Sequence, residues 1–142
     1  MVQRDYLLRE IEKIGAIFIA IKHKLFGGKE NFSISVENQI ENIKGMLLNE
    51  INFDLNKFLD LDIADSNEYI CKFDGFSIEN IENFAECIFK IGFNDNCENS
   101  KKYLEKALQL YDLCNSKSKT YSFEREKKIT ALKNTIIQYE TS

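Results

Sequence analysis

The sequence of 142 residues contains no proline at all, and glycine occurs only 6 times. Average usage of ~5% would place about seven prolines in a chain of this length. Proline is the residue that most strongly interrupts helices and stiffens loops, and strand-rich folds are punctuated by glycine and proline turns. The missing prolines therefore predict an all-α protein.

Length and composition predict one ordered domain over residues 1–142. A mass of 16.6 kDa is typical of a single domain. Hydrophobic residues make up 44% of the chain and charged residues 30%, which excludes a disordered tail or a collagen-like repeat. The apolar run Ile14–Ile21 is far shorter than the ~20 residues needed to cross a bilayer, so no membrane partner is expected.

Apolar residues recur at helical spacing along almost the whole chain. The predicted helices cover 3–26, 34–51, 54–60, 65–73, two helices of a hairpin over 78–115, and 122–140. Their expected starts carry polar caps, with Asp65 and Glu68 as a capping pair for the fourth helix; the other caps are Ser33 or Ser35, Asp54, Ser77 and Ser122. Glycines are expected to end two of the helices, at Gly27-Gly28 and at Gly92.

The first helix carries an apolar stripe at spacings of 4, 3, 4, 3 and 4, made by Leu7, Ile11, Ile14, Phe18, Ile21 and Leu25. A helix with this rhythm packs along its whole length against other helices. Either the helix is central to a bundle, or part of its face meets a partner or a second copy of the chain. In the second case we expect a homodimer through Ile11, Phe18 and Leu25.

The segment Tyr103–Tyr111 resembles the second helix of a tetratricopeptide repeat. Ala107, Tyr111 and Cys114 match the alanine, aromatic and small positions of that pattern. The resemblance implies a right-handed array of stacked antiparallel helical hairpins. The repeats would be degenerate, since Ser77 and Ser122 are 45 residues apart rather than the repeat's 34 and the closing proline is missing.

The opening of the first helix, Arg4–Gly15, is similar to a group of small uncharacterised bacterial proteins with a long N-terminal helix before repeat-like hairpins. By analogy of fold, the two resemblances imply a non-catalytic interaction or scaffold module that binds a protein or peptide in a concave groove, without a cofactor.

The chain lacks a recognisable catalytic or metal-binding motif. Its four cysteines, Cys71, Cys87, Cys97 and Cys114, contain no C-x-x-C pair, and His23 is the only histidine. The N-terminus enters a charged amphipathic segment rather than a signal peptide. Free thiols in a reducing cytoplasm are therefore expected. A small enzyme with a reactive cysteine is an alternative, because Cys97 precedes a helix start that would lower its pKa.

Charge is distributed unevenly, with a net −10 over residues 37–99 and a net +4 over residues 100–142. The acidic part includes Glu79, Glu82 and Glu86, interpreted as a solvated helix face. The basic C-terminal helix offers a second alternative, binding of nucleic acid, through a patch made by Lys117, Lys119, Arg125, Lys127, Lys128 and Lys133 with Tyr121 and Phe123. Phe123 is expected to pack inward, and the acidic middle argues against nucleic acid as a partner.

Overall fold

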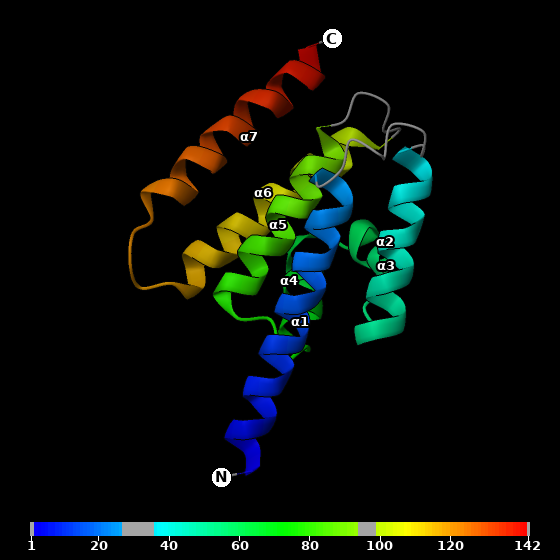
Figure 1. The fold of residues 1–142 in the computed structure, drawn as a ribbon. Coiled ribbons are helices and arrows are strands. Elements are labelled where there is room, and N and C mark those ends of the chain that lie inside the picture. The colour runs from blue at the N-terminus through cyan, green and yellow to red at the C-terminus, as the bar shows by residue number, and fades with distance from the viewer. Residues whose placement is uncertain (1, 27–35, 94–98, 142) are drawn as a thin grey trace.

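The computed structural model describes residues 2–26, 36–93 and 99–141, and within these ranges it contains seven α-helices and no β-strand (Figure 1). The helices are α1 (Val2–Phe26), α2 (Val36–Ile51), α3 (Leu55–Asp60), α4 (Ile63–Cys71), α5 (Ile78–Gly92), α6 (Ser100–Lys117) and α7 (Phe123–Thr141). The predicted all-α class is confirmed, and the expected helix ends lie within two residues of these bounds. The expected Gly27-Gly28 stop and the Ser33 or Ser35 cap lie outside the described residues.

Five helices form a row in the order α2, α1, α5, α6, α7 (Figure 1). Helices α5 and α6 make the most extensive contact and run antiparallel, and α7 turns back along α6 in the opposite direction. Helix α1 packs on the other side of α5. The short helices α3 and α4 connect α2 to α6, since α3 touches both of them and α4 touches α6.

Aspartates begin both short helices. The Asp54 side chain accepts a hydrogen bond from the backbone N–H of Lys57 and caps α3 as predicted. The cap of α4 is Asp62, whose carboxylate accepts from the N–H of Asp65 at 2.8 Å. The expected Asp65–Glu68 capping pair is therefore wrong. Asp65 occupies the third helical position instead, where a carboxylate still interacts favourably with the helix dipole.

Asn52 follows the last residue of α2 and adopts the backbone conformation that glycine usually provides after a helix. It has a positive φ of 59°, a conformation that asparagine tolerates better than most residues. The N–H of Phe53 then reaches back to the Leu47 carbonyl at 3.0 Å, and the N–H of Asn52 donates to the Leu48 carbonyl at 3.0 Å, so this C-terminal motif satisfies backbone carbonyls near the end of α2. The motif turns the chain sharply and carries the Phe53 side chain into the core, where it is fully buried.

Gly92 is the last residue of α5, but it is not the left-handed cap expected from the sequence, because its φ is not positive. Its role is steric. A Cβ on Gly92 would lie 2.9 Å from Tyr103 Cβ and 3.0 Å from the Ser100 carbonyl oxygen. The absence of a side chain therefore allows the start of α6 to approach the end of α5 closely.

The core lies where α1 and α5 meet the α3–α4 segment, and aromatic rings dominate it. The Phe53 ring lies within 6 Å of several other rings, those of Phe58, Tyr69, Phe73, Phe76 and Phe84. Phe18 of α1 stacks on Phe84 of α5 with centroids 5.2 Å apart. Phe18, Phe53 and Phe84 are almost completely buried, so this cluster joins the first helix to the rest of the fold.

Candidate functional site

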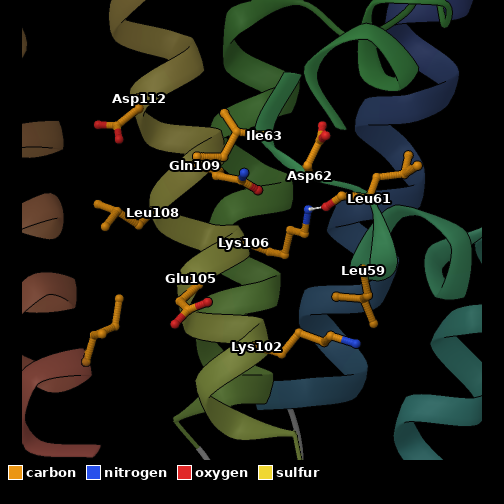
Figure 2. A pocket seen from close by; sticks show the side chains of 11 residues that line it. Leu59, Leu61, Asp62, Ile63, Lys102, Glu105, Lys106, Leu108, Gln109 and Asp112 are labelled. Atoms are coloured by element: carbon orange, nitrogen blue, oxygen red, sulfur yellow. Dashed lines mark hydrogen bonds between the residues drawn. The ribbon is translucent and has the colours of Figure 1, made fainter. Parts of the chain in front are cut away.

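A groove of about 510 Å³ lies between α6, α7 and the α3–α4 segment. Its lining comprises Leu59, Leu61, Asp62, Ile63, Lys102, Glu105, Lys106, Leu108, Gln109, Asp112 and Ile136. Figure 2 shows that α6 supplies one wall and that the end of α3 and the start of α4 supply the facing wall. The volume lies within the ~300–1,000 Å³ range of ligand-binding clefts.

Lys106 is the most unusual residue of this groove, because its side chain is only 6% exposed. Its ammonium group donates hydrogen bonds to the Leu61 carbonyl and to Ser66 Oγ and lies 5.1 Å from the centre of the Phe58 ring. Burial lowers the pKa of Lys106, and the negative charge of Asp62 partly opposes that shift. The lysine therefore fastens the α3–α4 connection to α6, and its donors are directed into the protein.

The sequence pattern around Lys106 does not indicate its role. The helical stripe that predicts the buried face of this helix contains Tyr103, Ala107 and Tyr111, and Lys106 falls beside it in a position typical of a solvated lysine. The short segment 61–66 covers Lys106 only because α3 and α4 fold back onto α6. Nothing in the local pattern around residue 106 indicates that contact.

The charged groups on the groove differ in whether they are paired. Lys102 Nζ lies 2.6 Å from Asp60 Oδ1, and this contact lowers the pKa of Asp60. Glu105 shares Lys101 with Glu140, at 3.7 and 3.6 Å. Both lysines that line the groove are thus already engaged, whereas Glu105 on the groove shares the Lys101 ammonium with Glu140 outside it.

Asp112 and Gln109 lie on the groove wall without satisfying partners. Among the described residues, Asp112 has no ion pair within 4.0 Å, although Lys133 attracts it from farther away. Burial raises the pKa of Asp112. The buried Oε1 of Gln109 accepts no hydrogen bond from the described residues, and a buried acceptor without a donor costs about 1–3 kcal/mol. These two groups are therefore candidate contacts for a bound molecule.

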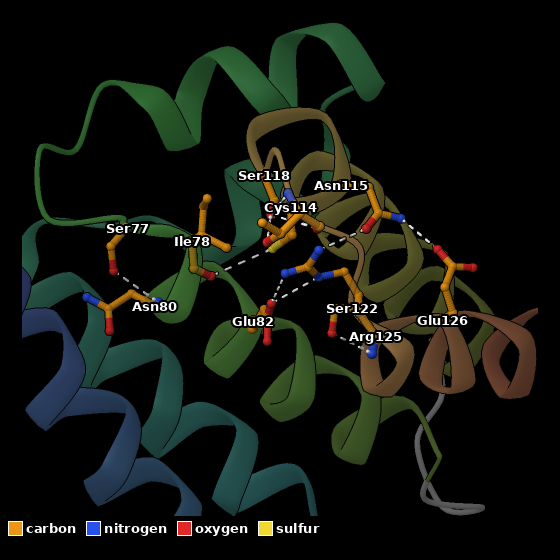
Figure 3. Close-up of polar contacts among 11 residues, drawn as sticks. Ser77, Ile78, Asn80, Glu82, Cys114, Asn115, Ser118, Ser122, Arg125 and Glu126 are labelled. Atoms are coloured by element: carbon orange, nitrogen blue, oxygen red, sulfur yellow. Dashed lines mark hydrogen bonds and ion pairs between the residues drawn. The ribbon is translucent and has the colours of Figure 1, made fainter.

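A second polar cluster joins α5, α6 and α7 (Figure 3). Arg125, only 5% exposed, donates two hydrogen bonds to Glu82 Oε1, one of them at 2.9 Å, and a third to Asn115 Oδ1 at 2.9 Å. Ser122 caps α7 by accepting from the Arg125 backbone N–H. Because the buried Arg125 binds α5 and α6 at once, the cluster is a structural clamp that holds α7 in place.

Two of the three glutamates expected on a solvated face of α5 instead form ion pairs with other helices. Glu82 binds Arg125 of α7, and Glu86 binds Lys22 of α1 at 3.0 Å. Only Glu79 is exposed as predicted. The expectation is corrected because α5 lies in the middle of the row, so that helices cover it on both sides.

The apolar face of the first helix is divided between core and surface. Ile14, Phe18 and Ile21 are buried within a single chain, so Phe18 is not available for the dimer contact expected through Ile11, Phe18 and Leu25. Leu7 is 42% exposed, and Ile11 is partly exposed. The side chain of Leu25 lies outside the described part of the chain. Among the described residues of this stripe, those accessible to a second copy lie at the projecting N-terminal end of α1 (Figure 1).

The three positions that match the tetratricopeptide pattern are all buried. Ala107, Tyr111 and Cys114 each have an exposed fraction of 1% or less and lie on α6, the helix in most extensive contact with α5. Cys114 Sγ also lies 3.7 Å from the Ile78 carbonyl oxygen, which ties the end of α6 to the start of α5 (Figure 3).

Two of the three cysteines that the structure describes are buried, and a buried thiol is a poor nucleophile. Burial raises the pKa of the Cys87 and Cys114 thiols to about 12, so both remain protonated. Cys71 is exposed, and Cys97, the candidate reactive thiol, lies outside the described residues. His23 is exposed. Within the described ranges, no three His, Cys, Asp or Glu residues are grouped as a metal site would require.

The basic patch expected at the C-terminus is smaller in the structure than in the sequence. Arg125 is buried against Glu82, and the Lys127 ammonium lies over the Phe123 ring at 4.7 Å. Phe123 itself is 61% exposed, so the expectation that it packs inward is wrong. The inner face of α7 instead consists of Ile129, Leu132 and Ile136.

Comparison with protein-family models, curated proteins and solved structures finds no match for this chain. The resemblance to tetratricopeptide repeats therefore stays a prediction from the sequence. None of the helices in the described ranges is both long enough and apolar enough to cross a membrane.

Proposed function

We propose that this chain is a non-catalytic protein-interaction module of tetratricopeptide-like type that binds a segment of a partner protein in the groove between α6, α7 and the α3–α4 segment. The observation that supports the proposal most directly is the groove, which is concave, carries apolar side chains and has a charged rim. Helix-lined grooves of this kind bind amphipathic segments through a few apolar anchor side chains.

The exposed rim supports a binding role over a purely structural one. Ile63, the first residue of α4, lines the groove and is 63% exposed. Leu108 on the facing helix is partly buried, and Ile136 of α7 adds a third apolar side chain. Apolar groups gathered around a concave surface mark an interaction site more often than scattered ones do.

The proposal is tested with peptides selected against the folded chain. A phage-displayed library of random 12-residue peptides is panned on the immobilised protein, and selected peptides are labelled for fluorescence anisotropy. Binding is then measured on Ile63→Gln and on the control Leu48→Gln, which alters an exposed leucine of α2 outside the groove. We expect Ile63→Gln to weaken binding at least about fivefold, since one methylene-sized apolar contact is worth ~0.8 kcal/mol and isoleucine contributes several.

Two outcomes contradict this function. The first is a selection that yields no peptide above background. The second is a set of peptides that bind Ile63→Gln as tightly as the unmodified chain, because such peptides do not use the groove. Circular dichroism of both variants checks that neither substitution alters the helices.

A further inference from the structure

The groove combines apolar side chains with carboxylates that the chain leaves unpaired or shares. Its two lysines are already engaged, Lys106 with Leu61 and Ser66, and Lys102 with Asp60. Asp112 forms no ion pair within the described residues. The charge that remains for an incoming molecule is therefore negative.

The polar atoms on the groove that lack partners within the described ranges are hydrogen-bond acceptors, so they also favour a ligand that supplies donors. Asp112 contributes carboxylate oxygens, which only accept hydrogen bonds. The Gln109 Oε1 atom is also an acceptor, and it has no donor among the described residues. A ligand that brings N–H donors complements the exposed Asp112 carboxylate, whereas a carboxylate or phosphate is repelled by it.

The Asp112 carboxylate is exposed on α6, so a molecule in the groove can reach it. Partial burial raises the pKa of Asp112, and Lys133 and Glu126 of α7 act on this carboxylate with opposite signs.

From this juxtaposition of an unpaired carboxylate, an unsatisfied acceptor and apolar side chains, among which Ile63 is exposed, we infer that the groove selects a cationic amphipathic segment. The segment carries apolar anchors for Ile63 and Leu108 and an arginine or lysine that pairs with Asp112. Arginine fits best, since its guanidinium offers five N–H donors in a planar fork that matches a carboxylate. The inference rests on the proposed function and specifies the chemistry of the partner.

The experiment uses peptides from the same selection that lose affinity on Ile63→Gln. Their affinities are measured for the unmodified chain, for Asp112→Asn and for the control Asp74→Asn, an exposed aspartate outside the groove. Each peptide is also made with citrulline in place of arginine, which preserves the shape of the side chain and removes its charge.

We expect the peptides to be enriched in arginine or lysine and to bind Asp112→Asn about five- to tenfold more weakly, with no change on Asp74→Asn. The citrulline peptide should bind the unmodified chain and Asp112→Asn equally, because the charge that senses Asp112 is gone. Affinity of the arginine peptide should also fall as salt increases.

Failure of this inference can be distinguished from failure of the proposed function. Peptides that depend on Ile63 but are neutral or acidic, or that ignore Asp112→Asn, overturn the cationic preference and leave the groove as a binding site. Absence of any peptide that depends on Ile63 removes both. Thermal unfolding of Asp112→Asn excludes a trivial loss of fold, because removing a disfavoured charge should not destabilise the chain.

Discussion

Replacing Gly75 by alanine tests the contact that places α1 on the rest of the fold. Gly75 lies in the turn between α4 and α5 and is packed against α1. A Cβ at this position would lie 2.4 Å from the Glu10 carbonyl oxygen, 2.7 Å from the Glu10 carbonyl carbon and 2.6 Å from Ile14 Cδ1. The isoleucine can rotate away, but the Glu10 backbone is part of a helix and can only move with it.

The magnitude follows from that geometry. Overpacking a well-packed site costs about 1–3 kcal/mol, and a backbone-to-backbone clash belongs near the upper end. Moving α1 away would also strain the bond from Asn80 Nδ2 to the Ile11 carbonyl, at 2.9 Å. The same amide donates to the Gly75 carbonyl at 2.8 Å, so it joins the turn to α1. We expect the free energy of unfolding to fall by about 2–3 kcal/mol, which lowers the melting temperature by about 6–15 °C in a chain of this size.

Gly45→Ala is the matched control. Gly45 lies inside α2, and a Cβ there meets nothing within 4 Å. Alanine is the better helix former by about 0.5–1 kcal/mol, so this substitution should raise the melting temperature by about 2–4 °C. Urea and thermal unfolding followed by circular dichroism measure both variants. A neutral or stabilising Gly75→Ala would refute the packing of the 72–77 turn on α1.

Four further predictions concern the clamp, the groove, a helix end and the first helix. Arg125→Met should lower the free energy of unfolding by about 1–3 kcal/mol because it leaves the half-buried Glu82 unpaired. Adding Glu82→Gln to this variant should recover part of that loss in urea unfolding. If the two substitutions instead destabilise the chain additively, the clamp is contradicted. Asp112→Asn should stabilise the chain at neutral pH, by no more than about 0.5 kcal/mol. Since burial raises the pKa of Asp112, the folded protein binds the Asp112 proton more tightly than the unfolded chain does. The stability of the unmodified chain therefore falls relative to that of Asp112→Asn as pH rises above about 4. A stability difference between the two chains that is independent of pH would refute this reasoning. Asn52→Val should destabilise by about 1–2 kcal/mol, because a β-branched residue disfavours the positive φ, whereas Asn52→Gly should be tolerated in the same thermal unfolding assay. For the dimer expected through the first helix, Leu7→Glu should dissociate it without loss of helix content, and a monomeric mass of the unmodified chain by light scattering at high concentration would exclude the dimer.

Much of the local structure was predictable because helices are encoded by neighbouring residues. The stripe that contains Ile14, Phe18 and Ile21 predicts a buried helix, and those residues are buried. Asp54 and Ser77 cap their helices as predicted. The error at Asp65 has a local reason, since Asp62 lies three residues earlier and offers the same capping chemistry.

The candidate groove was not predictable from the sequence. Lys106, Gln109 and Asp112 fall on the apparently polar side of their helix, and their pattern is typical of a solvated face. Lys106 is buried and Gln109 half-buried because the α3–α4 segment folds over α6 and α7 lies alongside it, whereas Asp112 stays exposed at the groove. The same applies to Glu82 and Arg125, which are separated by 43 residues.

The sequence by itself determined the all-α class, the approximate ends of the helices and most of the buried positions, because helical periodicity and capping depend on residues within a few positions of one another. Only the tertiary structure decided which helices are neighbours, why Gly75 and Gly92 are glycines, and which charges remain unpaired. These properties depend on residues far apart in the chain, and a charged side chain has the same local sequence signature whether it faces water or another helix.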